Sequence, residues 1–508
     1  TQHAMLVAWG EYAQSIGVVE RIESVPLDQK EVEHSPQRKV LEFLVAILGG
    51  LPYLKDISRS AHPLDQDRAV AKAWGQESWA DQSGVSRTLT ALTPEQAAQI
   101  AAVLQEVSQP FIDREVLLAL RNQGRVVYDG DLTGRPVSNS STSYPNVAFG
   151  HMSDEVALGY QAALVSFHSP TFGRLWLSVQ LHPGDKIACT ALTAMVHSAE
   201  AQTKVRPWRR TDLLAQRLAR LQREDSALAA QVERAQQCLA QACAAQEQVE
   251  QQLQLGQQQL SDLETLYRVK EKPERPHSQL AQVRQRVAVY ARRQERRVRA
   301  VIQARQGLDK AQARLVQQQR EIEQLVQRLA TFEQENATNP APIRALFRLD
   351  AGFGTPENVT WLIELGYEVY TKPYGAWLKA DLLRQTSATT HWTRVGKNAE
   401  MVAWAAQPVS KCPYPLDGAL ERFYAGETLR YSALIHYGQD AVTTDLSAWF
   451  GNYNGRQTIE AGIKEGKNVF QMYHLKVRSE AALFLQEHFA AFAANLVRWA
   501  AHWLTTAC

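Results

Sequence analysis

Cysteine is scarce in this 508-residue sequence, and its five cysteines are scattered: Cys189, Cys238, Cys243, Cys412 and Cys508. No two of them form a CxxC pair, and none has histidines at the spacing of a zinc site. The pattern argues against a disulfide framework and against a structural zinc site. A reducing compartment, the cytoplasm, is the expected location.

Long apolar runs and an excess of one charge are also missing. The first residues, TQHAMLVAWGEYAQ, lack a basic segment followed by an apolar run, and residues 481–504 are interrupted by Glu487, His488 and Arg498. We therefore expect neither a signal peptide nor a membrane span. The formal net charge of +2 excludes a uniformly basic surface and leaves only local patches for nucleic acid.

Complete nucleotide-binding motifs are absent as well. The turn at residues 352–354 (GFG) lacks the third glycine of a dinucleotide-binding loop. Residues 462–468 (GIKEGKN) are one residue short of a P-loop and lack its serine or threonine. We expect no nucleotide cofactor.

The length of the chain calls for several domains. Residues 1–120 show helical periodicity, for example in residues 40–51 (VLEFLVAILGGL). Within them, residues 79–92 (WADQSGVSRTLTAL) are typical of a turn and a short helix that carries Ser86 and Arg87, as in small helix-turn-helix modules. A helical domain is expected there, used either for DNA binding or for packing alone.

Residues 121–208 change to the period of strands. Three strands are predicted at 124–136, 156–168 and 173–182, and three successive strands indicate an antiparallel meander. The first strand carries Asp129 and Asp131 on one face because side chains alternate along a strand. The two carboxylates either share a cation or belong to a turn.

Residues 209–336 contain almost no aromatic side chains and follow an a/d rhythm of Leu, Val, Ile and Ala. Pro273 and Pro276 interrupt the rhythm midway, so an antiparallel coiled-coil hairpin is predicted with its tip at the prolines. Its second arm carries a run of arginines: Arg284, Arg286, Arg292, Arg293, Arg296, Arg297 and Arg299. The run is either a solvated outer face or a surface for a phosphate backbone or a partner subunit.

Residues 337–375 are expected to form a strand, a helix and a strand. The first strand ends at Asp350, where catalytic groups commonly lie in open α/β sheets. Thr355-Pro356 is a favourable helix start. A mainly β insertion is expected at 376–440, with Trp377, Trp392 and Trp404, and further helices at 441–508.

One of these late helices is predicted at residues 452–470 (NYNGRQTIEAGIKEGKNVF). Asn454-Gly455 leaves its start open, and the alternative is that Tyr453 belongs to the preceding loop. On a single helix, Tyr453, Arg456, Glu460 and Lys467 fall within about 60° of one another at roughly 100° per residue. A carboxylate then lies between two cations. The alternative is a solvated charge stripe.

The spacing Tyr-(2)-Arg-(3)-Glu-(6)-Lys resembles the signature of bacterial insertion-sequence DDE transposases of the Tyr-Arg-Glu-Lys type. Residues 131–134 (DLTG) and 349–354 (LDAGFG) are similar to the aspartate motifs of such enzymes. The resemblance covers about half of the chain and implies an α/β fold: an RNase H-like mixed sheet with a helical N-terminal domain, the coiled coil and a small β insertion. This sequence differs in placing the coiled coil between the two aspartates rather than after the second.

The resemblance also implies roles for individual residues. Asp131, with Asp129 as the fallback, Asp350 and Glu460 would hold two Mg²⁺ ions, or Mn²⁺, at about the 3.5–4 Å separation of two-metal sites. Tyr453, Arg456 and Lys467 would hold the transposon end, and one of the three tryptophans would support a flipped base.

The implied partners are double-stranded DNA, as terminal inverted repeats and target, and a second copy of the chain in a homodimer. Water would cleave the transposon end, and the freed 3′-OH would then attack the target. A domesticated nuclease and an inactive DNA-binding or coiled-coil scaffold are the alternatives.

Overall fold

The computed structural model describes residues 1–30, 33–152 and 155–507; Cys508 lies outside the described residues. The chain divides into two compact units. One comprises Thr1–Arg209 and Asn339–Cys508, and the other is Arg210–Thr338. The expectation of a mixed α/β protein with a mixed sheet and long helices is confirmed.

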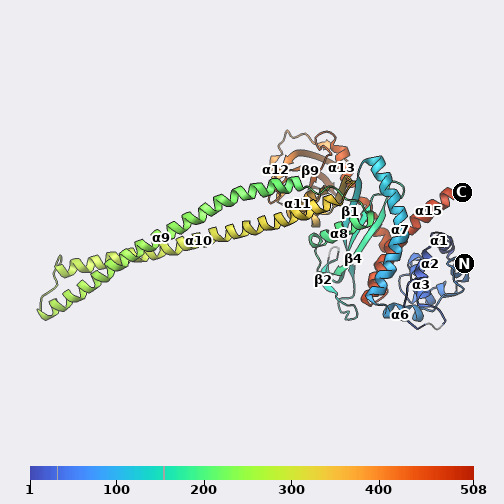
Figure 1. Ribbon diagram of the computed structural model, residues 1–508, viewed down its shortest axis with the longest axis horizontal. Helices are drawn as coiled ribbons and strands as arrows, with labels where there is room; N and C mark the ends of the chain where they lie inside the picture. The colour runs from blue at the N-terminus through green and yellow to red at the C-terminus, as the bar shows by residue number, and fades with distance from the viewer. Residues whose placement is uncertain (31–32, 153–154, 508) are drawn as a thin grey trace. The chain divides into compact units, whose positions relative to one another are not determined.

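The first unit begins with a group of helices (Figure 1). Ser35, Asp67, Asp81 and Thr93 cap four of these helices, because the oxygen of each side chain accepts a backbone N–H of the first turn. The described elements before the first strand are α1 (Ala4–Ser15), α2 (Val18–Glu23), α3 (Pro36–Leu48), α4 (Asp56–Arg59), η1 (Leu64–Gln66), α5 (Arg68–Ala73), α6 (Gln82–Ala91) and α7 (Pro94–Gln123).

A ten-stranded sheet follows, in the order β2-β3-β1-β5-β6-β10-β9-β8-β7, with β4 paired to β3. The predicted meander is confirmed, because β1 pairs antiparallel with β3, and β3 with β4. Helix α8 (Ala188–Thr203) packs against these three strands. The strands of this part are β1 (Val126–Pro136), β2 (Ala148–Met152), β3 (Glu155–Phe167) and β4 (Leu175–Pro183).

The strand, helix and strand predicted around Asp350 are also present. They are β5 (Ala345–Leu349), α11 (Pro356–Glu364) and β6 (Glu368–Thr371), with the short helix η2 (Ala351–Phe353) after β5. The side chain of Thr355 accepts the N–H of Asn358 at the start of α11. Both strands run parallel to β1, so that β1, β5 and β6 have their carboxyl ends at the same edge of the sheet.

The region 376–440 is mainly β, and its strands belong to the central sheet. The region comprises α12 (Trp377–Gln385), β7 (Thr393–Arg394), β8 (Ala399–Gln407), β9 (Leu416–Ala425) and β10 (Thr428–Tyr437). Antiparallel pairing of β10 with β6 joins these strands to the central sheet. One edge of β6 pairs with β5, and β10 supplies hydrogen-bond partners for the backbone N–H and C=O groups of its other edge.

The prediction of one helix over 452–470 is wrong. The structure has α13 (Leu446–Asn454) and α14 (Gln457–Asn468), separated at Gly455 and Arg456, followed by α15 (Glu480–Ala507). Asn and Gly are weak helix formers, and a Cβ at residue 455 would overlap the guanidinium of Arg348. Among the described residues, no helix combines the length and the apolar content needed to cross a bilayer.

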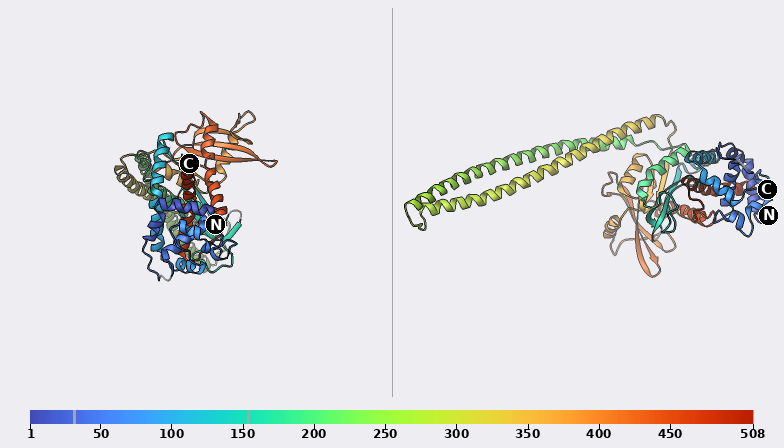
Figure 2. Two further views of the ribbon diagram at one scale, coloured as in Figure 1. Left: turned by 90° about the vertical axis from the view of Figure 1, so that its right-hand side faces the viewer. Right: turned by 90° about the horizontal axis from the view of Figure 1, so that it is seen from below.

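The second unit is a hairpin of two 59-residue helices, α9 (Thr211–Val269) and α10 (Gln279–Ala337), each about 88 Å long at 1.5 Å per residue. They run side by side in Figure 1 and in the right-hand view of Figure 2. Residues 270–278 join them, and the side chain of Ser278 caps α10.

The chain leaves the sheet-containing unit and returns to it at neighbouring points. The carbonyl of Arg206 accepts the N–H of Ile343 at 3.2 Å and the side-chain amide of Asn339 at 3.1 Å. The ends of the insertion are therefore tied together within the first unit itself.

Candidate active site

The register of two parallel strands brings the two predicted aspartates together. Gly130 of β1 is aligned with Leu349 of β5, so Asp131 and Asp350 are the next residues of the neighbouring strands, which are about 4.8 Å apart. Both aspartates line one cavity of about 690 Å³. The meander and the later parallel strand therefore place two carboxylates at one edge of the sheet.

Glu460, in the first turns of α14, is connected to Asp131 through the side chain of Arg456. Arg456 donates from Nη2 to Oδ2 of Asp131 and from Nη1 to Oε1 of Glu460, each at 2.8 Å. The Arg456 side chain is 7% exposed, whereas that of Glu460 is 52% exposed. The Nε of Arg456 is buried and has no hydrogen-bond partner among the described residues. One guanidinium thus lies between two of the three predicted carboxylates.

The three carboxylates interact electrostatically. The pKa of Asp131 is raised to about 6, chiefly by burial and also by the negative charges of Asp350 and Glu460, against the opposing effects of Arg456 and the Leu132 N–H. Crowded anions in a partly desolvated site favour either a proton or a cation. The structure therefore brings Asp131, Asp350 and Glu460 into one site.

Lys467 and Tyr453, the other two residues predicted to contact DNA, differ from each other in their surroundings. Lys467 is half-buried, and its ammonium makes no hydrogen bond or ion pair with another described residue. Burial and the nearby Arg135 lower the pKa of Lys467, and Asp131 opposes that shift. Tyr453 is 7% exposed and packs in a core cluster with Trp449. Lys467 is thus available to an anion, whereas the ring of Tyr453 is held by packing.

Asp129 is not available as the alternative first carboxylate. It is fully buried and paired with Arg348, which donates from Nε to Oδ1 at 2.6 Å and from Nη2 to Oδ2 at 2.7 Å. A third bond runs from Nη1 of Arg348 to the carbonyl of Asn452, at 2.9 Å. Arg348 therefore connects β1, β5 and the end of α13, directly before Arg456.

Sequence reasoning missed this role of Arg348. The signal was an arginine in the otherwise apolar strand ALFRL, two residues before Asp350, because a buried arginine needs a buried acceptor. Gly462 of α14 was missed in the same way, since a Cβ there would overlap the guanidinium of Arg174. Arg174 and Arg498 both pair with Glu465, which holds α14 in place.

The three tryptophans expected to include a base support are all partly exposed. The guanidinium of Arg422 lies over the ring of Trp392, at 4.2 Å from its centroid, and Tyr431 lies beside it. Which of Trp377, Trp392 and Trp404 supports a base stays open.

The carboxylates of this site are suitable ligands for a divalent cation, but the guanidinium of Arg456 occupies the position between Asp131 and Glu460. Asp131, Asp350 and Glu460 supply the hard oxygen donors that Mg²⁺ prefers. As the described residues are placed, no three His, Cys, Asp or Glu side chains are close enough to hold a metal ion. The guanidinium between Asp131 and Glu460 accounts for this spacing.

Replacing Arg456 by glutamine is therefore expected to tighten Mn²⁺ binding in the absence of DNA, by at least about tenfold, because it removes a competing cation from two carboxylates. Calorimetric titration or Mn²⁺ electron paramagnetic resonance at pH 8, where Asp131 is ionised, measures it. Lys464→Gln is the matched control, since Lys464 is an exposed cation of the same helix. Unchanged or weaker binding by Arg456→Gln would contradict this account.

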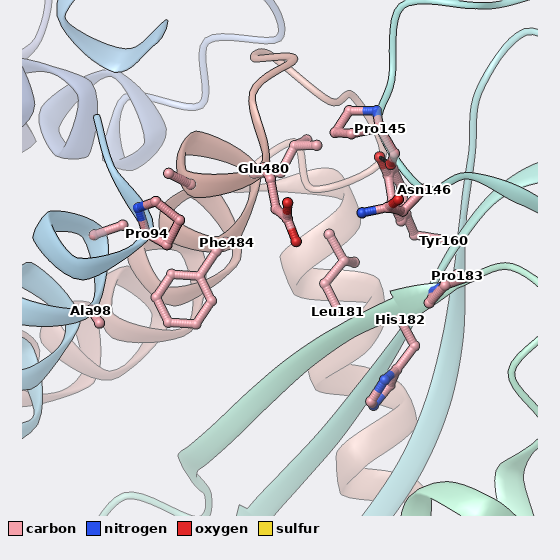
Figure 3. A pocket seen from close by; sticks show the side chains of 13 residues that line it. Pro94, Ala98, Pro145, Asn146, Tyr160, Leu181, His182, Pro183, Glu480 and Phe484 are labelled. Atoms are coloured by element: carbon pink, nitrogen blue, oxygen red, sulfur yellow. Dashed lines mark hydrogen bonds between the residues drawn. The ribbon is translucent and has the colours of Figure 1, made fainter. Parts of the chain in front are cut away.

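A second cavity, of about 390 Å³, lies between α7, α15 and the strands β3 and β4. Figure 3 shows Pro94 and Phe484 on one side of it, Asn146 and Tyr160 on the other, and Glu480 between them. Among the described residues that line it, Glu480 is the one carboxylate, and the predicted site residues are not among them. The cavity is thus separate from the carboxylate site.

Asp131, Asp350, Glu460 and Arg456 are thus in one site, Lys467 lies within electrostatic reach of it, and Asp129 belongs to a buried ion pair. Compared with known proteins, the sequence matches no family model, and no curated protein is significantly similar to it.

Proposed function

We propose that this protein is a DNA transposase that catalyses metal-dependent strand cleavage and strand transfer at transposon ends. The observation that carries the proposal is the meeting of Asp131, Asp350 and Glu460 from two parallel strands and a helix far apart in the sequence. Three carboxylates in one site, with Asp131 buried and Glu460 exposed, are suited to holding divalent cations beside a phosphodiester.

The element order supports an RNase H-like core for this function. A meander, a helix, a parallel strand, a second helix, another parallel strand and a late glutamate-bearing helix follow one another as the resemblance implies. The N-terminal helices, with Arg87 exposed on α6, are the proposed grip on the terminal repeat. Activity as a homodimer on two ends belongs to the same proposal.

The side chains of the site have two proposed roles, metal binding and phosphate binding. Asp131, Asp350 and Glu460 would hold two Mg²⁺ ions, which supply an activated water and neutralise charge on the leaving oxygen. Arg456 and Lys467 would bind the neighbouring 5′ phosphate, for which Arg456 has to leave its carboxylate partners. A phosphate of the DNA end is a fitting acceptor, since guanidinium binds it in bidentate geometry.

The test is cleavage of end-labelled duplexes that carry the sequences flanking the coding region, with purified protein and Mg²⁺. We expect Glu460→Gln to reduce cleavage by at least about a hundredfold, because it removes an anionic ligand for the cations. Glu357→Gln is the matched control, because Glu357 is an exposed glutamate in the first turn of α11. Equal cleavage by Glu460→Gln and wild type would refute the role of Glu460.

A further inference from the structure

The outer half of helix α10 is strongly one-sided in charge. Residues 284–305 contain eight arginines and a single carboxylate, Glu295. The neighbouring stretch 240–264 of the antiparallel helix α9 adds only four carboxylates: Glu247, Glu250, Asp262 and Glu264. The hairpin therefore carries a local positive excess although the whole chain is nearly neutral.

Six of these arginines form an exposed surface, which we call the arginine face: Arg286, Arg292, Arg293, Arg296, Arg297 and Arg299. At 100° per residue they lie within about 160° of the circumference of α10. Within the hairpin, all of which the structure describes, none of the six is in an ion pair with a carboxylate; Arg284, outside the face, pairs with Glu264 and Glu274. The face is thus exposed cationic charge that the hairpin itself does not neutralise.

The position of Arg297 argues against a face that serves solvation alone. The a/d rhythm of α10 through Leu280, Val283, Val287, Tyr290 and Val301 assigns residues 294 and 297 to the seam between the helices. Gln294 and Arg297 occupy these two positions instead: Oε1 of Gln294 is buried without a hydrogen-bond partner in the described structure, whereas Arg297 is exposed. Stability alone favours apolar residues at both positions, so another requirement explains the arginine.

We infer that the arginine face binds the phosphate backbone of double-stranded DNA without regard to sequence. The face extends over about 20 Å of helix, the length of duplex that carries roughly twelve phosphates. Arginine matches phosphate in bidentate geometry, whereas a solvated face has no need of arginine over lysine.

Backbone binding to a duplex fits better than binding to a single strand. Single-strand sites combine cations with aromatic rings on which the bases stack. Residues 291–331 contain no aromatic side chain, and Tyr290 already lies under the guanidinium of Arg293. A broad cationic face on one continuous helix, without aromatic rings, suits the backbone of a duplex.

Binding of the full-length chain to a fluorescent 30-base-pair duplex of arbitrary sequence tests the inference, by anisotropy in 50–300 mM KCl with EDTA. EDTA prevents cleavage, so the result does not depend on the proposed function. The variant Arg292→Gln, Arg293→Gln, Arg296→Gln, Arg297→Gln should lower the slope of log affinity against log salt by about 3 to 4, at roughly 0.9 per lost phosphate contact. Affinity at 100 mM KCl should fall at least tenfold.

The matched control removes four exposed arginines of the hairpin that lie off the face, as Arg223→Gln, Arg234→Gln, Arg314→Gln, Arg320→Gln. It should keep a slope within about one unit of wild type. Glutamine keeps helix propensity close to that of arginine, and circular dichroism at 222 nm verifies that both variants are folded. An unchanged slope in the face variant, or an equal reduction in both variants, would overturn the inference.

Discussion

Replacing Asp131 by asparagine is expected to reduce Mg²⁺-dependent strand cleavage by at least a thousandfold while it stabilises the protein without ligands. The loss follows from the position of Asp131 within electrostatic reach of Asp350 and Glu460, where its charge is needed to hold cations. The gain follows from the cost of that charge when no divalent cation is bound. Function and stability are thus expected to oppose each other at this residue.

The sign of the stability effect follows from the pKa. Burial raises the pKa of Asp131 from 3.8 to about 6, so the folded protein holds this proton more tightly than the unfolded chain. The resulting stability is complete below about pH 4 and is lost as the pH rises through about 6. At pH 7 the ionised carboxylate therefore costs at most about 3 kcal/mol, little screened because the side chain is only 13% exposed.

Unfolding curves of wild type and Asp131→Asn from pH 4 to pH 8, with EDTA present, measure the effect. The two free energies should coincide near pH 4 and separate toward pH 7 in favour of the variant. Asp129→Asn is the control on the same strand, and it should destabilise because Asp129 is fully buried against Arg348. A destabilised Asp131→Asn at pH 7 would contradict the assignment of Asp131 as an anion kept for a cation.

Replacing Arg348 by methionine is expected to lower the free energy of unfolding of the sheet-containing unit by about 3–5 kcal/mol. The change leaves the carboxylate of Asp129 buried without its bidentate partner, which is the costly way to break a buried ion pair. It also removes the donor to the carbonyl of Asn452, so the start of α14 loses its anchor to β5.

Tryptophan fluorescence in a denaturant titration reports this change, because no tryptophan lies in residues 210–338. The double variant Asp129→Asn, Arg348→Met should recover much of the loss, since it removes the unpaired charge. Arg344→Met is the matched surface control; Arg344 pairs with Glu368 but is 42% exposed, so its loss should cost less than about 1 kcal/mol. Equal stability of the single and double variants would show that the charge of Asp129 is not what Arg348 compensates.

Periodicity and spacing were sufficient for the elements that local sequence determines. The meander, the strand–helix–strand unit around Asp350 and the two long helices were all predicted from runs of apolar residues and from caps such as Thr355. The choice of Asp131, Asp350 and Glu460 came from the resemblance to DDE transposases, and the parallel register of β1 and β5 explains why the aspartates meet.

The features that sequence reasoning missed depend on contacts between distant residues. The break at Gly455 is fixed by the guanidinium of Arg348, more than a hundred residues earlier, and the incorporation of β7–β10 into the central sheet depends on the free edge of β6. Likewise, the spacing that placed Arg456 near Glu460 gave no sign that its guanidinium also reaches Asp131. Such outcomes follow from tertiary packing, which a local pattern does not record.

The chain leaves the first unit near Arg206 and returns to it near Ile343, and these two residues are hydrogen-bonded to each other. The hairpin is therefore an insertion whose two ends lie close together. Such an insertion can change length during evolution without disturbing the strands on either side, because its two ends stay fastened to each other. Deleting one heptad from each arm would shorten its reach by about 10.5 Å and preserve the seam. The reach of this arm is therefore an adjustable property, set independently of the chemistry at the sheet edge.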